Sequence, residues 1–562
     1  MAYQRLGDIL LSMGLITEAE LKDALETQKT IKKRLGSVLV DSGVINEKQL
    51  IDALVTHIGV EFIDLSKVII PAEMTQILSK NIAQKYDVVP VRVLHDKLYL
   101  AMCDPLNFVA IEEVKSATRK KIIPMIATTQ AVELAILTLY GNESAARAIE
   151  EMKRESSNNP ERDTTFISSD IDENIDAAPT IRFVSSIIER AIAERASDIH
   201  LEPNFDELRV RMRIDGVLHN ILTVPKDLQS SVISRIKVMA SMDISERKIP
   251  QDGRTNVHIK KLDFDLRVST LPTIYGEKVV IRLLDKNSGL LDKSAIGLVG
   301  ADLNKYLNLI KNPSGLVLIA GPTGSGKSST MYTMIRELNS EFVNLVTLED
   351  PVEYNIENVN QVQINEKTGM TFAGGLRSIL RQDPDIIAVG EIRDGETAQI
   401  AMRASITGHL VLSTIHTNDS FSTIDRLADI GVQPYIVAAA MRGIISQRLV
   451  RKICPNCRHE YIPNPDDLEA IGLPPKTNIK FYRGSGCPMC FNAGYRGRTG
   501  VFEILMFTHE VREAVAMGLK GDQIQSMIKE TDFVSLPENC RRLVLEGVTT
   551  IEEAQKIIGE KL

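Results

Sequence analysis

Short apolar runs and helical segments alternate through the second half of the chain. The runs GLVLIAG, NLVTLED, DIIAVGE and HLVLSTIHT are continuous, and residues with helical character separate each run from the next. Continuous apolar runs are typical of strands that are buried on both faces. Residues 291–562 are therefore predicted to form an α/β fold, a parallel sheet covered by helices. Residues 505–562 are expected to be helical.

Residues 179–290 have a different pattern. One stretch with apolar residues at helical spacing comes first, and strand-like segments that alternate between apolar and polar residues follow it. This order predicts a smaller α+β domain. Residues 141–178 before it are polar and charged, with few residues that could bury a face, so we expect a flexible linker there.

The first 57 residues contain a repeat. Residues 5–28 and 34–57 are identical at 12 of 24 positions, and each copy contains a short helical stretch that ends at a glycine before a second helix begins. Two copies are too few for a solenoid. We therefore expect them to pack against residues 61–139, which completes a mostly helical N-terminal domain over residues 1–140.

Composition and charge indicate a multidomain protein and argue against several classes of protein. With 562 residues, 44% of them apolar, the chain is expected to form several domains. A net charge of -8, from 66 basic and 74 acidic residues, argues against a main role in coating nucleic acid or an anionic membrane. Apolar runs fall short of the roughly 18 residues that a membrane-spanning helix needs, and Arg5 and Asp8 interrupt any signal peptide. A cytoplasmic protein is expected.

A glycine-rich segment between a predicted strand and a predicted helix carries the clearest chemical signal. It matches G-x-x-x-x-G-K-[ST], in which the glycines let successive backbone N–H groups point at phosphate oxygens. Lys327 is expected to reach the β- and γ-phosphates, and Ser328 is expected to ligate Mg²⁺. The residues predicted to bind ATP and Mg²⁺ are Gly321, Pro322, Thr323, Gly324, Ser325, Gly326, Lys327, Ser328 and Ser329.

Three other predicted strands of this region end in groups that suit phosphate chemistry. Glu391 stands where most P-loop enzymes have the aspartate that holds magnesium through water. Glu349 is the candidate for orienting the attacking water, and an acidic turn that caps a helix is the alternative. His416 follows a further strand, where it is placed to sense a γ-phosphate, and a hydrogen-bonded core histidine is the alternative. Open α/β sheets bind ligands at this end of their strands.

Four of the six cysteines form two CxxC pairs within residues 450–500. The pairs are Cys454 with Cys457 and Cys487 with Cys490. Four thiolates in this pattern suit a closed tetrahedral Zn²⁺ site with a structural role, and a redox-active CxxC is the alternative. Cys103 and Cys540 are expected only to pack.

The segments GPTGSGKS, LEDPVEY, LRQDPDIIAVGEIRD and GHLVLSTIHTND resemble the Walker A, Asp, Walker B and His boxes of the secretion ATPases. These are the motors of type II secretion and type IV pili, and the resemblance covers residues 179–562. It implies a RecA-like P-loop domain, a PAS-like smaller lobe, a ring of six protomers, and ATP bound between the lobes. It also implies that Arg267 and Arg282 of the smaller lobe contact the phosphates. Arginines that alternate on a solvated strand face are the alternative.

The N-terminal repeat resembles the paired motif of a domain that binds cyclic di-GMP in some of these ATPases. His57 stands where the second motif has glutamine, and a docking module for a membrane partner is the alternative. Arginine offers bidentate hydrogen bonds to the guanine edge. The contacts implied by the resemblance are Arg5, Gly7, Gly14, Gln28, Arg34, Gly36, Gly43 and Asp104.

Chain length, repeat and cysteines together favour the pilus-assembly branch of the family. A hexameric ATPase that extends type IV pili is expected, peripheral at the inner face of the cytoplasmic membrane, with a pilus platform protein and accessory pilus proteins as partners. The type II secretion ATPase is the closest alternative. A nucleic-acid translocase is a more distant alternative, because no basic stretch is interleaved with aromatic residues.

Overall fold

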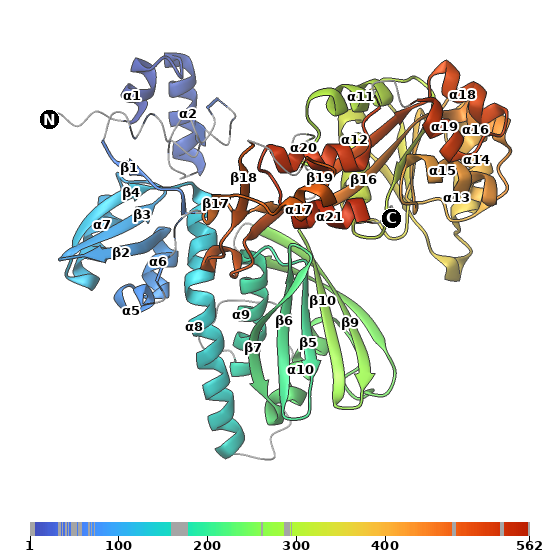
Figure 1. The fold of residues 1–562 in the computed structure, drawn as a ribbon. Coiled ribbons are helices and arrows are strands. Elements are labelled where there is room, and N and C mark those ends of the chain that lie inside the picture. The colour runs from blue at the N-terminus through green and yellow to red at the C-terminus, as the bar shows by residue number, and fades with distance from the viewer. Residues whose placement is uncertain are drawn as a thin grey trace. The chain divides into compact units, whose positions relative to one another are not determined.

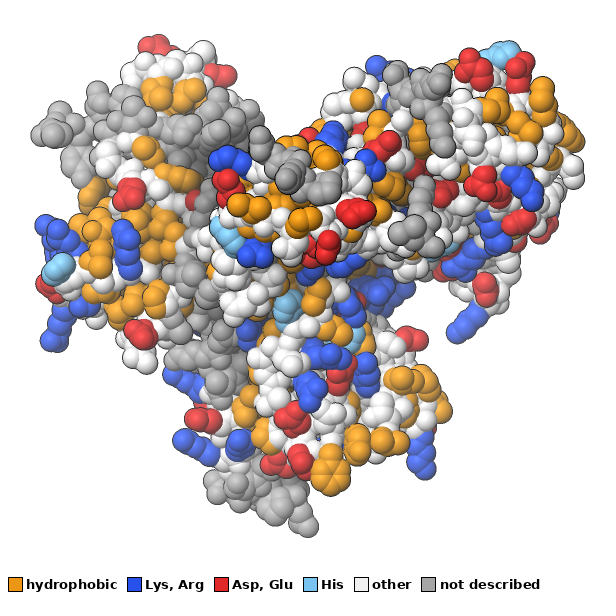
Figure 2. All heavy atoms as spheres, in the orientation of Figure 1, with side chains coloured by type: hydrophobic (Ala, Val, Ile, Leu, Met, Phe, Trp, Pro, Cys, Tyr) orange, Lys and Arg blue, Asp and Glu red, His pale blue; other side chains and the backbone are white. Residues whose placement is uncertain are grey.

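The chain forms two compact units in the computed structural model, Met1–Thr255 with Leu266–Leu283, and Asn256–Asp265 with Leu284–Leu562. No described helix combines the length and the apolar character that a bilayer crossing requires. On the face drawn in Figure 2, acidic and basic side chains are interspersed. The described residues are 6–31, 59–65, 73–158, 178–259, 262–285, 295–474, 479–528 and 533–559, with the single positions 35, 38, 39, 42, 44, 45, 53, 55, 68, 70, 71 and 293.

The N-terminal region begins with two short helices and continues into a small sheet (Figure 1). Gly14, at φ +67°, ends the first helix in a left-handed turn that favours glycine. The sheet has the strand order β1-β4-β3-β2, and its helices bury an apolar core against it. The elements are α1 (Leu6–Ser12), α2 (Glu18–Ile31), β1 (Glu61–Phe62), α5 (Met74–Ile77), α6 (Lys80–Tyr86), β2 (Val88–Leu94), β3 (Lys97–Met102), α7 (Phe108–Thr118) and β4 (Lys121–Ile126).

A long helix, α8 (Thr129–Asn158), occupies the first part of the expected linker. Ala, Glu, Lys, Arg and Met are strong helix formers and dominate this stretch. Ala148 and Met152 are buried, and α8 packs against α9 (Pro179–Ala193), where the hydroxyl of Thr180 lies 3.4 Å from the sulfur of Met152. The expectation of a flexible linker is therefore wrong for residues 141–158, which are helical. The rest of the expected linker, residues 159–177, lies outside the described residues.

The region predicted as α+β contains a six-stranded sheet of order β7-β6-β5-β10-β9-β8. Burial alternates residue by residue along β6, as the alternating sequence predicts. Most apolar residues of α9 are buried, and so are Val232, Ile233 and Ile236 of α10. The remaining elements are β5 (Asp198–Pro203), β6 (Glu207–Ile214), β7 (Val217–Pro225), η2 (Lys226–Leu228), α10 (Gln229–Met239), β8 (Gln251–Ile259), β9 (Leu262–Thr273) and β10 (Gly276–Asp285).

The C-terminal region contains the predicted parallel sheet, with strand order β13-β12-β14-β15-β11-β16-β19. All pairs are parallel except β16 with β19, which are antiparallel. The apolar runs are buried along their whole length, which confirms the α/β prediction. The elements are α11 (Gly300–Ile310), β11 (Gly315–Ala320), α12 (Lys327–Leu338), β12 (Leu345–Glu349), β13 (Asn360–Gln363), η3 (Glu366–Thr368), α13 (Phe372–Ile379), β14 (Ile386–Val389), α14 (Gly395–Ile406), β15 (Leu410–Ile415), α15 (Ser420–Asp429), α16 (Pro434–Ala440), β16 (Met441–Ile453) and β19 (Tyr495–Met506).

Helices follow β19 to the end of the described chain, as predicted, and a small hairpin of β17 with β18 lies between β16 and β19 in sequence. The last two of these helices pack on β16 and β19, and the first two pack on α16 and α15. The elements are β17 (Arg458–Tyr461), α17 (Pro465–Ala470), β18 (Phe481–Gly484), η4 (Pro488–Cys490), α18 (His509–Ala516), α19 (Gly521–Met527), α20 (Leu536–Leu545) and α21 (Ile551–Ile558).

A fully buried carboxylate, Glu503 on β19, joins the starts of two helices. One of its oxygens accepts hydrogen bonds from the backbone N–H (3.0 Å) and the hydroxyl of Ser420, the first residue of α15. The other accepts from the backbone N–H of Leu536, the first residue of α20, at 3.1 Å. Helix N-termini carry partial positive charge, so both helices stabilise the buried anion. Glu503 thus fixes α15 and α20 against the sheet.

We predict that Glu503→Gln lowers the stability of the chain by about 2 kcal/mol or more, because the amide nitrogen turns a donor toward donors in a buried site. The measurement is thermal and urea unfolding of the full chain. Glu546→Gln is the matched control, since Glu546 is exposed, and it should leave both midpoints unchanged. Equal midpoints for the two variants would contradict the bridging role of Glu503.

Candidate functional site

The glycine-rich segment forms a tight turn between β11 and α12, as the motif predicts. Gly321 has φ +152°, and a Cβ there would lie 2.4 Å from the hydroxyl of Ser325 and 2.7 Å from the carbonyl of Gln447. The side-chain amide of Gln447 on β16 donates to the carbonyl of Ser325 at 2.7 Å. The turn is therefore held against β16 by this hydrogen bond and this close approach. Its backbone N–H groups lie at the start of α12, and the N-terminus of a helix is a site where anions bind.

Lys327, the first residue of α12, lies folded over this turn. Its ammonium donates to the carbonyls of Gly321 (2.8 Å) and Pro322 (3.0 Å), and the Nδ1 of His416 lies 3.5 Å away. Burial lowers the pKa of Lys327 to about 8, and the nearby charge of Glu391 acts in the opposite direction. A buried cation on a phosphate-binding turn suits a polyanionic ligand.

Glu391 and His416 lie at the ends of neighbouring strands, next to Lys327. The Nε2 of His416 is 3.4 Å from Oε2 of Glu391, and Arg393 forms an ion pair with Oε1 of the same carboxylate. The hydrogen bond that Arg393 donates to Glu391, together with the charge of Glu391, raises the pKa of Arg393. Desolvation lowers this pKa by less than the hydrogen bond raises it. The structure thus brings together three predicted residues, Lys327, His416 and Glu391, in one chain of contacts.

Glu349 ends β12, the strand beside β14, and is buried. Its Oε2 accepts from the hydroxyl of Tyr332, and its Oε1 accepts from the hydroxyl of Thr347 and from the amide of Gln361 at 3.1 Å. The sequence indicated Glu349 but not these three donors. The backbone links the two strand ends directly, since the N–H of Gly390, just before Glu391, donates to the carbonyl of Leu348 at 2.8 Å.

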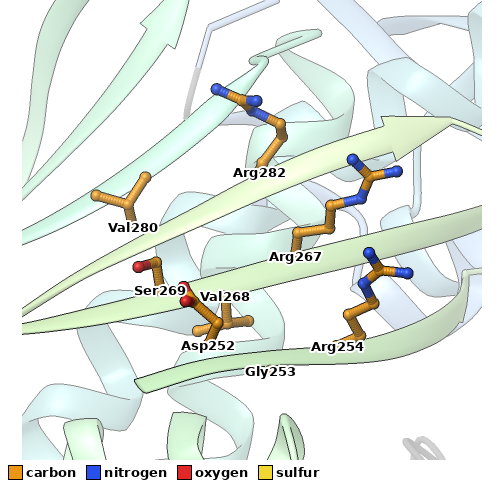
Figure 3. Close-up of a pocket in the computed structure, with 8 residues that line it drawn as sticks. All are labelled: Asp252, Gly253, Arg254, Arg267, Val268, Ser269, Val280 and Arg282. Atoms are coloured by element: carbon orange, nitrogen blue, oxygen red, sulfur yellow. The ribbon is translucent and has the colours of Figure 1, made fainter. Parts of the chain in front are cut away.

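The two arginines predicted in the smaller lobe line one hollow of about 440 Å³, and a third arginine lines it with them (Figure 3). Arg254, Arg267 and Arg282 come from the adjacent strands β8, β9 and β10. The Nε of Arg282 donates to Asp198 at 3.2 Å. Three guanidinium groups around one hollow suit an anionic ligand such as a phosphate. Sequence reasoning missed Arg254, which stands one residue before the strand-like segment that begins at Thr255.

The four predicted cysteines form one cluster, in which all sulfur atoms lie within 4.8 Å of one another. The separations are 3.9 Å between Cys454 and Cys487, 3.8 Å between Cys457 and Cys490, and 3.7 Å between Cys487 and Cys490. Tetrahedral Zn–S bonds of about 2.3 Å place sulfurs about 3.8 Å apart, so the cluster fits zinc.

Backbone and side-chain N–H groups surround the same sulfurs. The amide of Asn456 donates to Cys487 at 3.3 Å, and the N–H of Gly494 donates to Cys490 at 3.3 Å. Such donors stabilise metal-bound thiolates. The other two cysteines pack in apolar clusters, as predicted: Cys540 is buried and Cys103 is partly buried.

The predicted cyclic di-GMP contacts are only partly within the described residues. Arg5, Arg34, Gly36 and Gly43 lie outside them. Gly7 lies where α1 meets α2, since a Cβ there would be 2.9 Å from Leu21, and Gly14 ends α1. Gln28 belongs to α2, and the carboxylate of Asp104 accepts the backbone N–H of Leu106 at 3.0 Å.

A buried lysine on a glycine-rich turn, with a carboxylate and a histidine at adjacent strand ends, defines the class of P-loop ATPases. Residues 173–556 match the family described as Type II/IV secretion system protein, and residues 58–146 match the MshEN domain. Because the first match covers more than half of the chain, the chain belongs to the Type II/IV secretion system protein family. The repeat precedes the MshEN match, which contains Asp104.

Relatives support the same assignment. The type IV pilus assembly ATPase PilB of Myxococcus xanthus (strain DK1622) is 39% identical over 558 residues, 98% of this chain and 98% of that protein. Type II secretion system protein E of Dickeya dadantii (strain 3937) is 47% identical over 394 residues, 70% of this chain and 78% of that protein. The X-ray structure of the Legionella pneumophila ATPase DotB shares the fold, with a TM-score of 0.53 at 21% identity, over 70% of this chain and 99% of that chain. The expectations of an ATPase and of a secretion or pilus motor are confirmed.

Proposed function

We propose that this ATPase works as a homohexameric ring that drives the assembly and extension of type IV pili. The observation that supports pilus assembly is the extent of the match to the Myxococcus xanthus ATPase, which spans nearly the whole of both chains. The motor would act at the inner face of the cytoplasmic membrane, on an inner-membrane platform protein and accessory pilus proteins. Nucleic acid is not a proposed substrate.

Type II secretion is the second candidate, and the higher identity of the Dickeya dadantii protein, 47%, favours it. Complementation separates the two. The chain is expressed in one strain that lacks its pilus assembly ATPase and in another that lacks its type II secretion ATPase. We expect surface pili to return in the first strain. Restored secretion in the second strain without pili in the first would replace the proposal by its alternative.

For the reaction itself, we propose that Lys327 contacts the β- and γ-phosphates of ATP while Ser328 supplies a hydroxyl to Mg²⁺. Glu391 and His416 stand beside Lys327, and they act on the γ-phosphate side of the nucleotide. Glu349 orients the attacking water, its carboxylate direction being fixed by its three donors.

We propose that the three arginines that line the hollow in the smaller lobe compensate the negative charge of the phosphates. Arg254, Arg267 and Arg282 do so for nucleotide held by the other lobe or by a neighbouring protomer. If a neighbouring protomer holds the nucleotide, turnover requires the assembled ring.

We predict that Glu391→Gln binds ATP with nearly unchanged affinity but loses about 100-fold or more of its turnover, because a carboxylate at the γ-phosphate is needed only for the chemical step. Phosphate release and binding of a fluorescent ATP analogue measure the two quantities. Glu341→Gln, at an exposed position of the same unit, is the control. Normal turnover by Glu391→Gln would remove Glu391 from the reaction.

We propose that the four-cysteine cluster binds one Zn²⁺ per chain and serves folding only. Cys457→Ser is expected to lose the metal and to lower the midpoint of thermal unfolding, because the binding free energy of such a site contributes to folding. Elemental analysis and calorimetry are the measurements, and Cys103→Ser is the control. Protein purified without chelator that contains no zinc would contradict the proposal.

We also propose that the N-terminal region binds cyclic di-GMP and regulates the motor. Replacing Arg5 or Arg34 by Ala should weaken binding by about 1 to 3 kcal/mol, if each makes one bidentate base contact. Titration calorimetry on the full chain measures the affinity. Arg154→Ala, an exposed position on α8, should bind as the unchanged protein does. Folded protein that gives no binding heat at micromolar ligand would favour a partner-docking role for the repeat.

A further inference from the structure

The side chain of Tyr332 links the P-loop helix to the acidic segment that follows β12. Tyr332 lies on α12, five residues after Lys327, and only 1% of it is exposed. Its hydroxyl donates to Oε2 of Glu349 and accepts the backbone N–H groups of Glu353 (3.1 Å) and Tyr354 (3.3 Å). A hydroxyl has one proton to donate and two lone pairs, so this one is fully used.

The acidic segment depends on this hydroxyl at both ends. Glu349 begins it, and among the described hydrogen bonds to Glu349 that of Tyr332 goes to Oε2, whereas those of Thr347 and Gln361 go to Oε1. At the other end, the ring of Tyr354 packs edge-on against the ring of Tyr332, with centroids 5.3 Å apart. One of the three groups that fix the direction of the Glu349 carboxylate therefore comes from the same helix that carries Lys327.

We propose that Tyr332 is a positioning residue for ATP hydrolysis, whose hydroxyl holds Glu349 and the segment 349–354 in register with the P-loop. This inference deepens the proposed function, because it rests on the water-orienting role of Glu349. Tyr332 does not touch nucleotide, and it acts on the reaction only through Glu349. Positional errors of a catalytic group affect turnover more than substrate binding.

The same core contains a tyrosine that separates the effect of the hydroxyl from the effect of the ring. Tyr306 on α11 is fully buried and belongs to the same apolar cluster as Tyr332. Its hydroxyl has no hydrogen-bond partner among the described residues. Tyr306→Phe therefore removes a buried hydroxyl without breaking a hydrogen bond, and it is the matched control for Tyr332→Phe.

The test compares steady-state ATPase kinetics of the full chain for the two variants. Tyr332→Phe keeps the ring and its packing, and should lower kcat by about 10- to 100-fold, the range for one hydrogen bond to a charged group, with KM for ATP within about two-fold. Tyr306→Phe should leave both constants unchanged. A kcat for Tyr332→Phe within two-fold of the unchanged protein, or a KM that rises in step with a fall in kcat, would overturn the inference.

A double variant shows whether Tyr332 acts through Glu349. If it does, Tyr332→Phe should lower kcat no further in a chain that already carries Glu349→Gln, because residues that act as one unit are non-additive. Additive losses would mean that Tyr332 acts elsewhere, which overturns the inference.

The single variant Glu349→Gln tests the proposed function by itself. Normal turnover by Glu349→Gln would refute the water-orienting role. Loss of turnover in Glu349→Gln beside normal turnover in Tyr332→Phe would refute only the positioning role. The two failures are therefore distinct.

Discussion

Parallel pairing of β11, β12, β14 and β15 places the ends of four separate chain segments at one edge of a sheet. The register pairs Ala320 with Ile415 and Leu348 with Val389, so the residues that follow these four positions start their turns side by side. Each strand is buried on both faces, and no strand can slide without exposing apolar surface. The arrangement of Lys327, Glu349, Glu391 and His416 is thus a consequence of strand register.

The buried charges around this edge are stabilised in different ways. Lys327 uses backbone carbonyls and a nearby carboxylate, whereas the described hydrogen bonds to Glu349 come from neutral groups. In the other unit, Lys237 pairs directly with Glu277, and both are buried. Burial of a charge is costly unless hydrogen bonds or an opposite charge compensate it, so each of these groups is held in one direction.

Local signals in the sequence were sufficient for the parts of the site that depend on neighbouring residues. The P-loop turn, the strand ends that carry Glu391 and His416, and the meeting of the cysteine pairs follow from short motifs. The contact between Tyr332 and Glu349 depends on how α12 is rotated against β12, which no single segment encodes. The extension of α8 beyond residue 140 is supported both by its helix-forming residues and by packing against α9, and the second of these cannot be read from the segment itself.

Glu503 has a consequence for the motions of the protein. Its carboxylate is shared by the first turns of α15 and α20, which are far apart in sequence, and α15 begins shortly after His416. When the first turn of one helix opens, water reaches the carboxylate of Glu503. This water then competes for the hydrogen bond that the carboxylate accepts from the first turn of the other helix. The amide protons of the two helix starts are therefore expected to exchange with solvent as one cooperative unit, at a common opening free energy. A fluctuation at the C-terminal helices is in this way linked to the segment that follows the nucleotide site.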